Sequence, residues 1–155
     1  MPNREYITVD RDRFSYTRKH YNAKDELVLW ECFDSETDHL FLVMHYYYDE
    51  QGRKIREIAD VDNERERSHT ETLIRYEDEV MICESITHYA FSGYGLRDER
   101  TVEHFSGTSS FREVYDLETG ELKCVEDFDP AESLYREITY RPDGSVDVDY
   151  DDDIF

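Results

Sequence analysis

The sequence predicts an all-β domain, an antiparallel meander of consecutive hairpins that forms a strongly bent sheet or a flattened barrel or sandwich. Three observations predict this fold. A tyrosine followed by a short polar turn recurs five times along the chain. An apolar strand follows each turn, and its residues alternate between two faces where only one face is dry. No segment carries the sustained i, i+3, i+4, i+7 apolar stripe of an amphipathic helix.

The five hairpin units begin at tyrosines, and their turns contain residues suited to tight turns. Glycine supplies the position that needs a positive φ in three of them, at Gly52, Gly120 and Gly144. Asn22, Asp49 and Asp116 open turns because their side chains bond their own backbone. The sequence therefore predicts turns at residues 22–25, 49–52, 77–79, 117–120 and 142–144, after Tyr21, Tyr48, Tyr76, Tyr115 and Tyr140.

The strands differ in how much of their surface they are expected to bury. In "SVDVDY", Val146, Val148 and Tyr150 share one face, opposite Ser145, Asp147 and Asp149, which predicts one dry and one wet side. The segments 27–33 and 40–48 are apolar on both faces, so we expect them to be central and covered on both sides. The polar segment 56–74 is expected to be a loop between hairpins.

The hairpin signals indicate about ten strands in one domain. A sheet of that length must curl, close or split into two layers. A bent sheet or flattened barrel is favoured over an immunoglobulin-type sandwich, because the connections are successive hairpins and not Greek-key crossings. Residues 1–150 are expected to form this single β domain, and residues 151–155 an acidic C-terminal tail.

The composition is strongly acidic and rich in aromatic residues. Eighteen Lys and Arg stand against 39 Asp and Glu, a net charge of −21, while 13 Tyr, eight Phe and one Trp supply apolar surface for a core. Phosphates repel such a chain, so direct binding to nucleic acid is excluded, and anionic membranes are disfavoured as partners. The start "MPNREYITVD" has no apolar signal segment. Cys32, Cys83 and Cys124 are odd in number and widely spaced, which predicts free thiols and a cytoplasmic location.

The search for catalytic and metal-binding motifs predicts no enzyme, no cofactor and no metal site. The six histidines form no H-x-x-x-H pair, "FSGYGLRDER" lacks a complete phosphate-binding pattern, and G-x-S-x-G does not occur. Cys83 in "VMICESI" is interpreted as a small buried hydrophobic residue. The acidic run "DVDYDDD" lacks the glycine and the final glutamate of a calcium loop, so it is interpreted as a solvated surface.

The hairpin "YDEQGRKI" has the form Y-D-x-x-G-x-x-x followed by an apolar strand. It resembles the YD repeats of bacterial Rhs-type proteins and the MORN-variant hairpins of small bacterial proteins encoded beside polymorphic toxins. The resemblance covers residues 40–60 and 109–150, although the chain lacks the regular short period of true YD repeats. It implies a small, acidic, cytosolic immunity protein that blocks the active surface of a toxin.

The charge leads to the same expectation, because −21 exceeds what solubility requires. Carboxylates would steer a basic protein, such as a cognate nuclease or translation-targeting toxin, and aromatic side chains would anchor it. The alternatives are a DNA-mimic inhibitor of a nucleic-acid enzyme, a small-ligand-binding β domain or hydrolase, and an acidic domain whose charge only keeps it soluble. We expect a monomer when free and a 1:1 complex when bound. The predicted contact residues are Tyr47, Asp49, Glu50, Tyr76, Asp78, Glu79, Asp149, Asp151 and Asp152.

Overall fold

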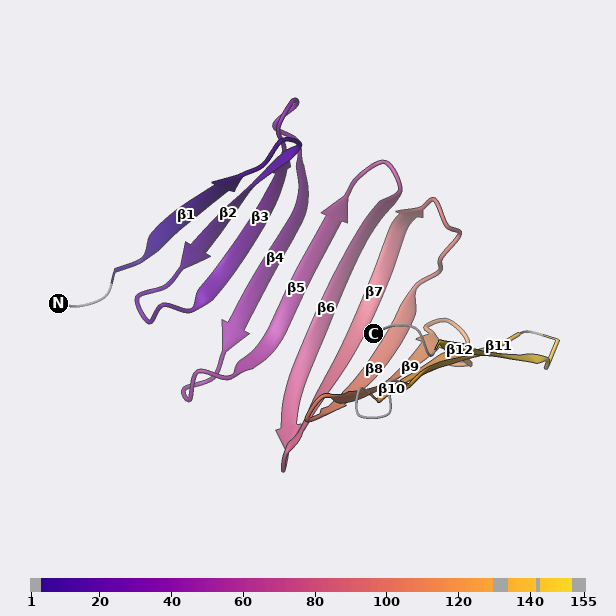
Figure 1. Cartoon of the computed structure of the whole chain (residues 1–155). Coiled ribbons are helices and arrows are strands. Elements are labelled where there is room, and N and C mark those ends of the chain that lie inside the picture. The colour runs from indigo at the N-terminus through magenta and orange to yellow at the C-terminus, as the bar shows by residue number, and fades with distance from the viewer. Residues whose placement is uncertain (1–3, 130–133, 142, 152–155) are drawn as a thin grey trace. The chain divides into compact units, whose positions relative to one another are not determined.

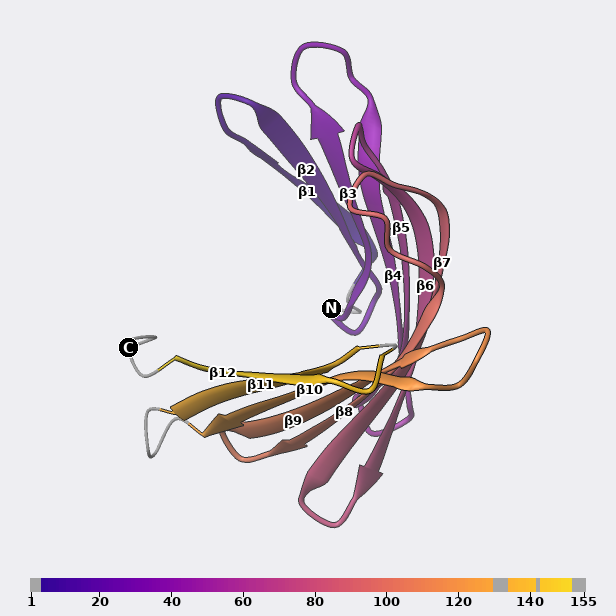
Figure 2. The same cartoon turned by 90° about the vertical axis from the view of Figure 1, so that its right-hand side faces the viewer.

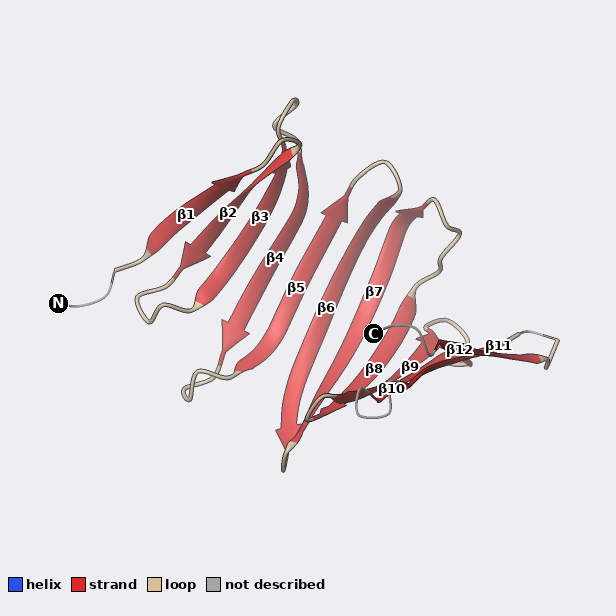
Figure 3. Cartoon of the chain, in the orientation of Figure 1, coloured by secondary structure: helices blue, strands red, loops and turns tan. Residues whose placement is uncertain are grey.

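The computed structural model describes residues 4–129, 134–141 and 143–151, and every regular element among them is a strand (Figure 3). The strands are β1 (Tyr6–Arg11), β2 (Ser15–Tyr21), β3 (Leu27–Asp34), β4 (Leu40–Tyr48), β5 (Lys54–Asp62), β6 (Glu66–Glu77), β7 (Val80–Ser92), β8 (Glu99–Ser106), β9 (Ser109–Asp116), β10 (Leu122–Asp129), β11 (Leu134–Tyr140) and β12 (Val146–Asp151). The described residues contain no helix of the length and apolar character that a bilayer crossing requires.

The strands form one 12-stranded sheet in which the spatial order is the chain order (Figure 1). Hairpin partners such as β1 and β2, β4 and β5, and β11 and β12 pair antiparallel. The predicted all-β meander of consecutive hairpins is therefore confirmed. Strands β1 and β12 are the two ends of the strand order.

The predicted turns connect strands, as expected. Hairpin turns lie at residues 22–25, 49–52, 77–79, 117–120 and 143–144. Residue 142, which belongs to the last predicted turn, lies outside the described part of the chain. Gly52, Gly120 and Gly144 have φ values of +80°, +74° and +87°. A side chain other than hydrogen is strained at such angles, so glycine is needed at these three positions.

Five turns share one device, an aspartate whose carboxylate accepts hydrogen bonds from the residues that follow it. Asp116 Oδ1, for example, accepts a bond of 2.8 Å from the backbone N–H of Thr119. Such bonds favour the ionised carboxylate and hold its pKa below the ordinary value. The five aspartates are Asp12, Asp34, Asp49, Asp116 and Asp143. The largest cause of the lowered pKa is a hydrogen bond from a backbone N–H at the first four, and a hydrogen bond from the Ser145 hydroxyl at Asp143.

These turn aspartates predict a loss of stability in acid. A pKa that is lower in the folded chain than in the unfolded chain stabilises the fold above the unfolded value, which is about 4, and this contribution is lost as the pH falls through the folded value. Replacing all five with Asn keeps an oxygen acceptor but removes the titration. We expect the free energy of unfolding of this variant, measured by urea denaturation, to fall less steeply below pH 4 than that of the wild type.

A matched control carries five Asp→Asn changes outside these turn bonds, at Asp10, Asp25, Asp60, Asp62 and Asp78. Its acid slope should stay close to that of the wild type, because the turn carboxylates still titrate. If the free energy of unfolding below pH 4 falls less steeply in both variants by the same amount, total charge and not the turn bonds governs the loss of stability in acid.

The prediction of a loop over 56–74 is wrong. The segment contains the end of β5, a short turn at 63–65 and most of β6. The Asn63 side chain closes the turn by accepting bonds of 2.8 Å and 2.9 Å from the N–H groups of Arg65 and Glu66. The strands are polar because much of their surface is exposed, so the apolar alternation expected of a strand is weak. The described residues form twelve strands and not about ten, because β1 and β8 lie outside the five predicted hairpin units.

The expected burial of three strands also differs from the structure. Strands β3 and β4 are half-buried along both faces, and among the residues of β3 only Cys32 is buried. The expected dry face of β12 is open instead, since Val146 and Val148 are 50% and 45% exposed. Alternation correctly predicts which residues share a face, but it does not show whether another layer covers that face.

The chain divides into two compact units: unit 1 contains residues 1–72 and 87–96, and unit 2 contains residues 73–86 and 97–155. In unit 1, Cys32 and Tyr46 are buried, and burial raises the pKa of Tyr46 to about 12. Lys54 Nζ lies 4.6 Å from the centre of the Tyr46 ring. In unit 2 the buried hydrophobic residues are Ile74, Ile82, Val102, Val114 and Val125.

Candidate partner-binding surface

Negative charge is divided unequally between the two units. Unit 1 contains eleven Lys and Arg and 17 Asp and Glu, for a net charge of −6. Unit 2 contains seven Lys and Arg and 22 Asp and Glu, for a net charge of −15. The acidic surplus that suggested a basic partner therefore lies mainly in unit 2.

Strand register gathers part of this charge into one line across β8–β12, the strands seen close to edge-on in Figure 2. Glu103 pairs with Arg112, which pairs with Glu126. Glu126 in turn pairs with Glu137, which pairs with Asp149. Directly paired residues project from the same face of a sheet. The five residues, called the acidic row below, therefore place four carboxylates and one guanidinium on one face of unit 2.

Arg112 forms an ion pair with Glu126 within the acidic row. Its Nη1 atom lies 3.3 Å and 3.2 Å from the two carboxylate oxygens of Glu126. Burial lowers the pKa of Arg112, but the neighbouring carboxylates of Glu126 and Glu103 outweigh burial, so the pKa is raised. Along the rest of the row Glu126, Glu137 and Asp149 lie directly opposite one another, and like charges in directly opposite positions destabilise a sheet.

Comparisons with family models, curated proteins and solved structures find no match to the chain. The functional interpretation therefore depends on the geometry of the described residues.

A thiol lies beside the acidic row. Cys124 Sγ and carboxylate oxygens of Glu126 and Glu137 lie within 4.8 Å of one another, a spacing that would suit a metal ion. Burial raises the pKa of the Cys124 thiol, and the two carboxylates raise it further. A metal binds the thiolate and not the thiol, so a metal ion here would have to displace the thiol proton. The absence of a metal site stays a prediction.

Cys32, Cys83 and Cys124 form no disulfide in the described part of the chain. Cys32 is buried, and burial raises its pKa, which suppresses the reactive thiolate. We expect a thiol reagent to titrate three groups in denaturant without reductant, and to modify Cys32 slowly in the native protein, as located by peptide mass spectrometry. A disulfide in the unreduced protein, or rapid native labelling of Cys32, would contradict this expectation.

The first predicted contact cluster lies at the β4–β5 turn of unit 1. Tyr47 is 42% exposed, and the guanidinium of Arg56 lies 5.1 Å from its ring centre. The carboxylate of Asp49 already accepts bonds of 3.0 Å and 2.9 Å from the N–H groups of Gln51 and Arg53, so it is occupied within its own turn. Glu50 is exposed.

The second and third clusters lie in unit 2. At the β6–β7 turn, Tyr76 is half-buried, Asp78 has a φ of +55°, and Glu79 is exposed. Asp149 is exposed and belongs to the acidic row, whereas Asp151 ends β12 and Asp152 lies outside the described residues. The structure therefore brings only Asp149 together with other carboxylates in the acidic row. The sequence analysis did not select Glu103, Glu126 and Glu137. Only the register of their strands brings them together, and the sequence predicts some of the turns between these strands but not the register.

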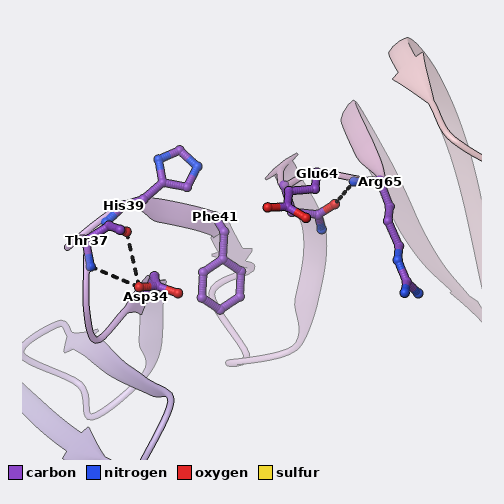
Figure 4. Close-up of a pocket in the computed structure, with 7 residues that line it drawn as sticks. Asp34, Thr37, His39, Phe41, Glu64 and Arg65 are labelled. Atoms are coloured by element: carbon purple, nitrogen blue, oxygen red, sulfur yellow. Dashed lines mark hydrogen bonds between the residues drawn. The ribbon is translucent and has the colours of Figure 1, made fainter.

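Unit 1 also contains a hollow of about 750 Å³ between the loops that follow β3 and β5 (Figure 4). Phe41 lies between Asp34 and Glu64 in this view. The Asp34 carboxylate accepts bonds of 2.9 Å from the N–H groups of Glu36 and Thr37, so it shapes the loop. His39 Nε2 lies 2.9 Å from the carbonyl oxygen of Asp62. The Asp34 carboxylate and the His39 ring thus take part in bonds that hold the loops.

A second hollow, of about 510 Å³, lies in unit 2 beside the β9–β10 and β11–β12 turns. Its cations are Arg97, Lys123 and Arg141, of which Arg141 pairs with Asp147, while Lys123 Nζ lies 3.8 Å from Glu99. These ion pairs reduce the positive charge available to an anionic ligand. In each hollow a threonine hydroxyl donates to a turn aspartate, Thr37 to Asp34 and Thr119 to Asp116, each at 3.1 Å, and these bonds hold the turns.

Proposed function

We propose that this protein is an inhibitor of the immunity type, which binds a cationic protein through the acidic row of unit 2 and blocks its active or target-binding surface. The observation that carries the proposal is the direct opposition of Glu126, Glu137 and Asp149 across three neighbouring strands. A cationic protein, such as a nuclease or translation-targeting toxin, has the positive charge needed to relieve the repulsion between these carboxylates.

The energetics favour a partner over a purely structural role. Opposite like charges destabilise a sheet by an amount on the order of the 0.2–1 kcal/mol that a favourable cross-strand pair contributes. A row with two such contacts weakens the isolated protein, and an Arg or Lys from a partner would convert repulsion into attraction. Solubility alone does not require the carboxylates to be adjacent, since dispersed charges serve it equally well.

Aromatic residues flank the acidic row on the same face. Phe105 in β8 pairs with Ser110, which pairs with Phe128 in β10, one row away from Glu103 and Glu126. Both phenylalanines are half-buried. Interfaces typically combine such apolar anchors with charged groups that steer the partner. The face therefore offers the two kinds of contact that binding to a cationic protein needs.

Co-expression with a candidate toxin, chosen from the products of the neighbouring genes, tests the proposal. The chain should restore growth, and the purified complex should weaken as salt rises, because salt screens exposed charges over about 8 Å at physiological ionic strength. If the chain binds no cationic protein and turns over a small molecule, the proposal is wrong. A nucleic-acid enzyme as partner, displaced from the chain by DNA, would identify DNA mimicry instead of toxin immunity.

A further inference from the structure

The two strands at the ends of the sheet order have exposed apolar residues. All six residues of β1 are exposed, and Ile7 and Val9 are 51% and 50% exposed. At the other end, Val146 and Val148 of β12 are similarly open. An edge strand presents unpaired N–H and C=O groups along its outer side, which can pair with a strand of another chain.

The two end hairpins carry opposite charge. Residues 6–21, which form β1 and β2, contain four Lys and Arg against two Asp. Residues 134–151, which form β11 and β12, contain two Arg against five Asp and Glu. The first hairpin is therefore net positive in a strongly negative chain, and the second is net negative. Two copies of the chain can bring these complementary ends together.

We propose that β1 of one copy pairs antiparallel with β12 of a second copy. Placing Ile7 opposite Val148 and Val9 opposite Val146 aligns the exposed apolar residues of both edges. Antiparallel pairing then sets Tyr6 opposite Asp149 and Thr8 opposite Asp147, so that no carboxylate faces another. Within the first hairpin Thr8 already pairs with Lys19, so a cation lies one strand away from Asp147 of the second copy.

This contact joins different surfaces of identical chains, so each pair retains one free β1 edge and one free β12 edge. Such heterologous contacts grow into open chains or close into rings. In this proposal the free protein is an assembly, whereas the sequence analysis expects a monomer. Of the acidic row, only Asp149 lies in the pairing strand β12, so the other row residues stay outside the contact. The free protein is thus expected to self-associate more at higher protein concentration.

Sedimentation velocity tests the proposal with one variant for each edge. Val9→Asp blocks the β1 edge and Val146→Lys blocks the β12 edge, and each variant alone should sediment as a monomer. A mixture of the two should form dimers, because the intact β12 edge of the first variant can pair with the intact β1 edge of the second. The double variant in one chain should recover part of the larger assembly, since position 9 faces position 146.

Ile55→Asp is the control, because Ile55 is an exposed residue of β5, away from both end strands, and this variant should assemble like the wild type. Circular dichroism of each variant shows whether it keeps its strands, and the mixing experiment requires both to fold. A wild-type chain that stays monomeric at every concentration overturns the proposal. So does an assembly that persists in both single variants, or a mixture that forms no dimer.

Discussion

Neutralising the acidic row should make the protein more stable and a weaker binder at the same time. The variant with Glu137→Gln and Asp149→Asn removes both like-charge contacts while keeping side-chain size, and it leaves Glu126 to pair with Arg112. We expect the free energy of unfolding to rise by about 1 kcal/mol, as relief of two like-charge contacts implies. We expect the dissociation constant for the cationic partner to rise at least about tenfold, a loss of about 1.4 kcal/mol in binding.

Urea denaturation measures the first effect, and titration calorimetry with the purified partner measures the second. The matched control makes the same change in net charge at two exposed glutamates outside the row, Glu36→Gln and Glu64→Gln. It should change both quantities much less. If both variants weaken binding equally, the interaction depends on total charge and not on the row. If the row variant is less stable than the wild type, these carboxylates have a structural role.

The fold was largely predictable because its signals are local. A turn depends on four or five neighbouring residues, so Gly120 at a φ of +74° and Asp116 bonded to Thr119 could be anticipated from the sequence alone. The strands beside the turn at 63–65 were missed because exposed polar residues hide the alternation on which strand prediction depends. The number of layers was not predictable either, since a half-buried strand such as β3 has the same apolar residues as a covered one.

The acidic row was less predictable, because it depends on register between strands. The β9–β10 pairing shifts between Leu122, which pairs with Tyr115, and Cys124, which pairs with Val114. Without this bulge, continued pairing would place Val125 opposite Arg112, and Glu126 would lose its ion pair. A slip of one residue sends every side chain to the other face of a sheet. Nothing in the local sequence signals where such a bulge falls, so Asp149 was named without its neighbours.

Removing the single cation of the acidic row should cause a large loss of stability. Arg112→Met keeps most of the aliphatic side chain but leaves Glu103 and Glu126 without the guanidinium that lies between them. Breaking a fully buried ion pair costs about 3–5 kcal/mol. The Arg112 side chain is 37% exposed and that of Glu126 is 25% exposed, so water screens part of this loss. We expect the free energy of unfolding, measured by urea denaturation, to fall by about 2 kcal/mol.

Two further variants separate the ion pair from the change in net charge. Arg75→Met removes one positive charge from a side chain that is 52% exposed and pairs with Glu84 at 2.8 Å, so its loss should be much smaller. Adding Glu126→Gln to Arg112→Met should restore part of the lost stability, because the unpaired carboxylate is then removed. Equal losses in Arg112→Met and Arg75→Met, or no recovery in the double variant, would show that Arg112 does not stabilise the sheet by neutralising the row. Recovery would establish that the sheet tolerates the Glu126 carboxylate because Arg112 neutralises it.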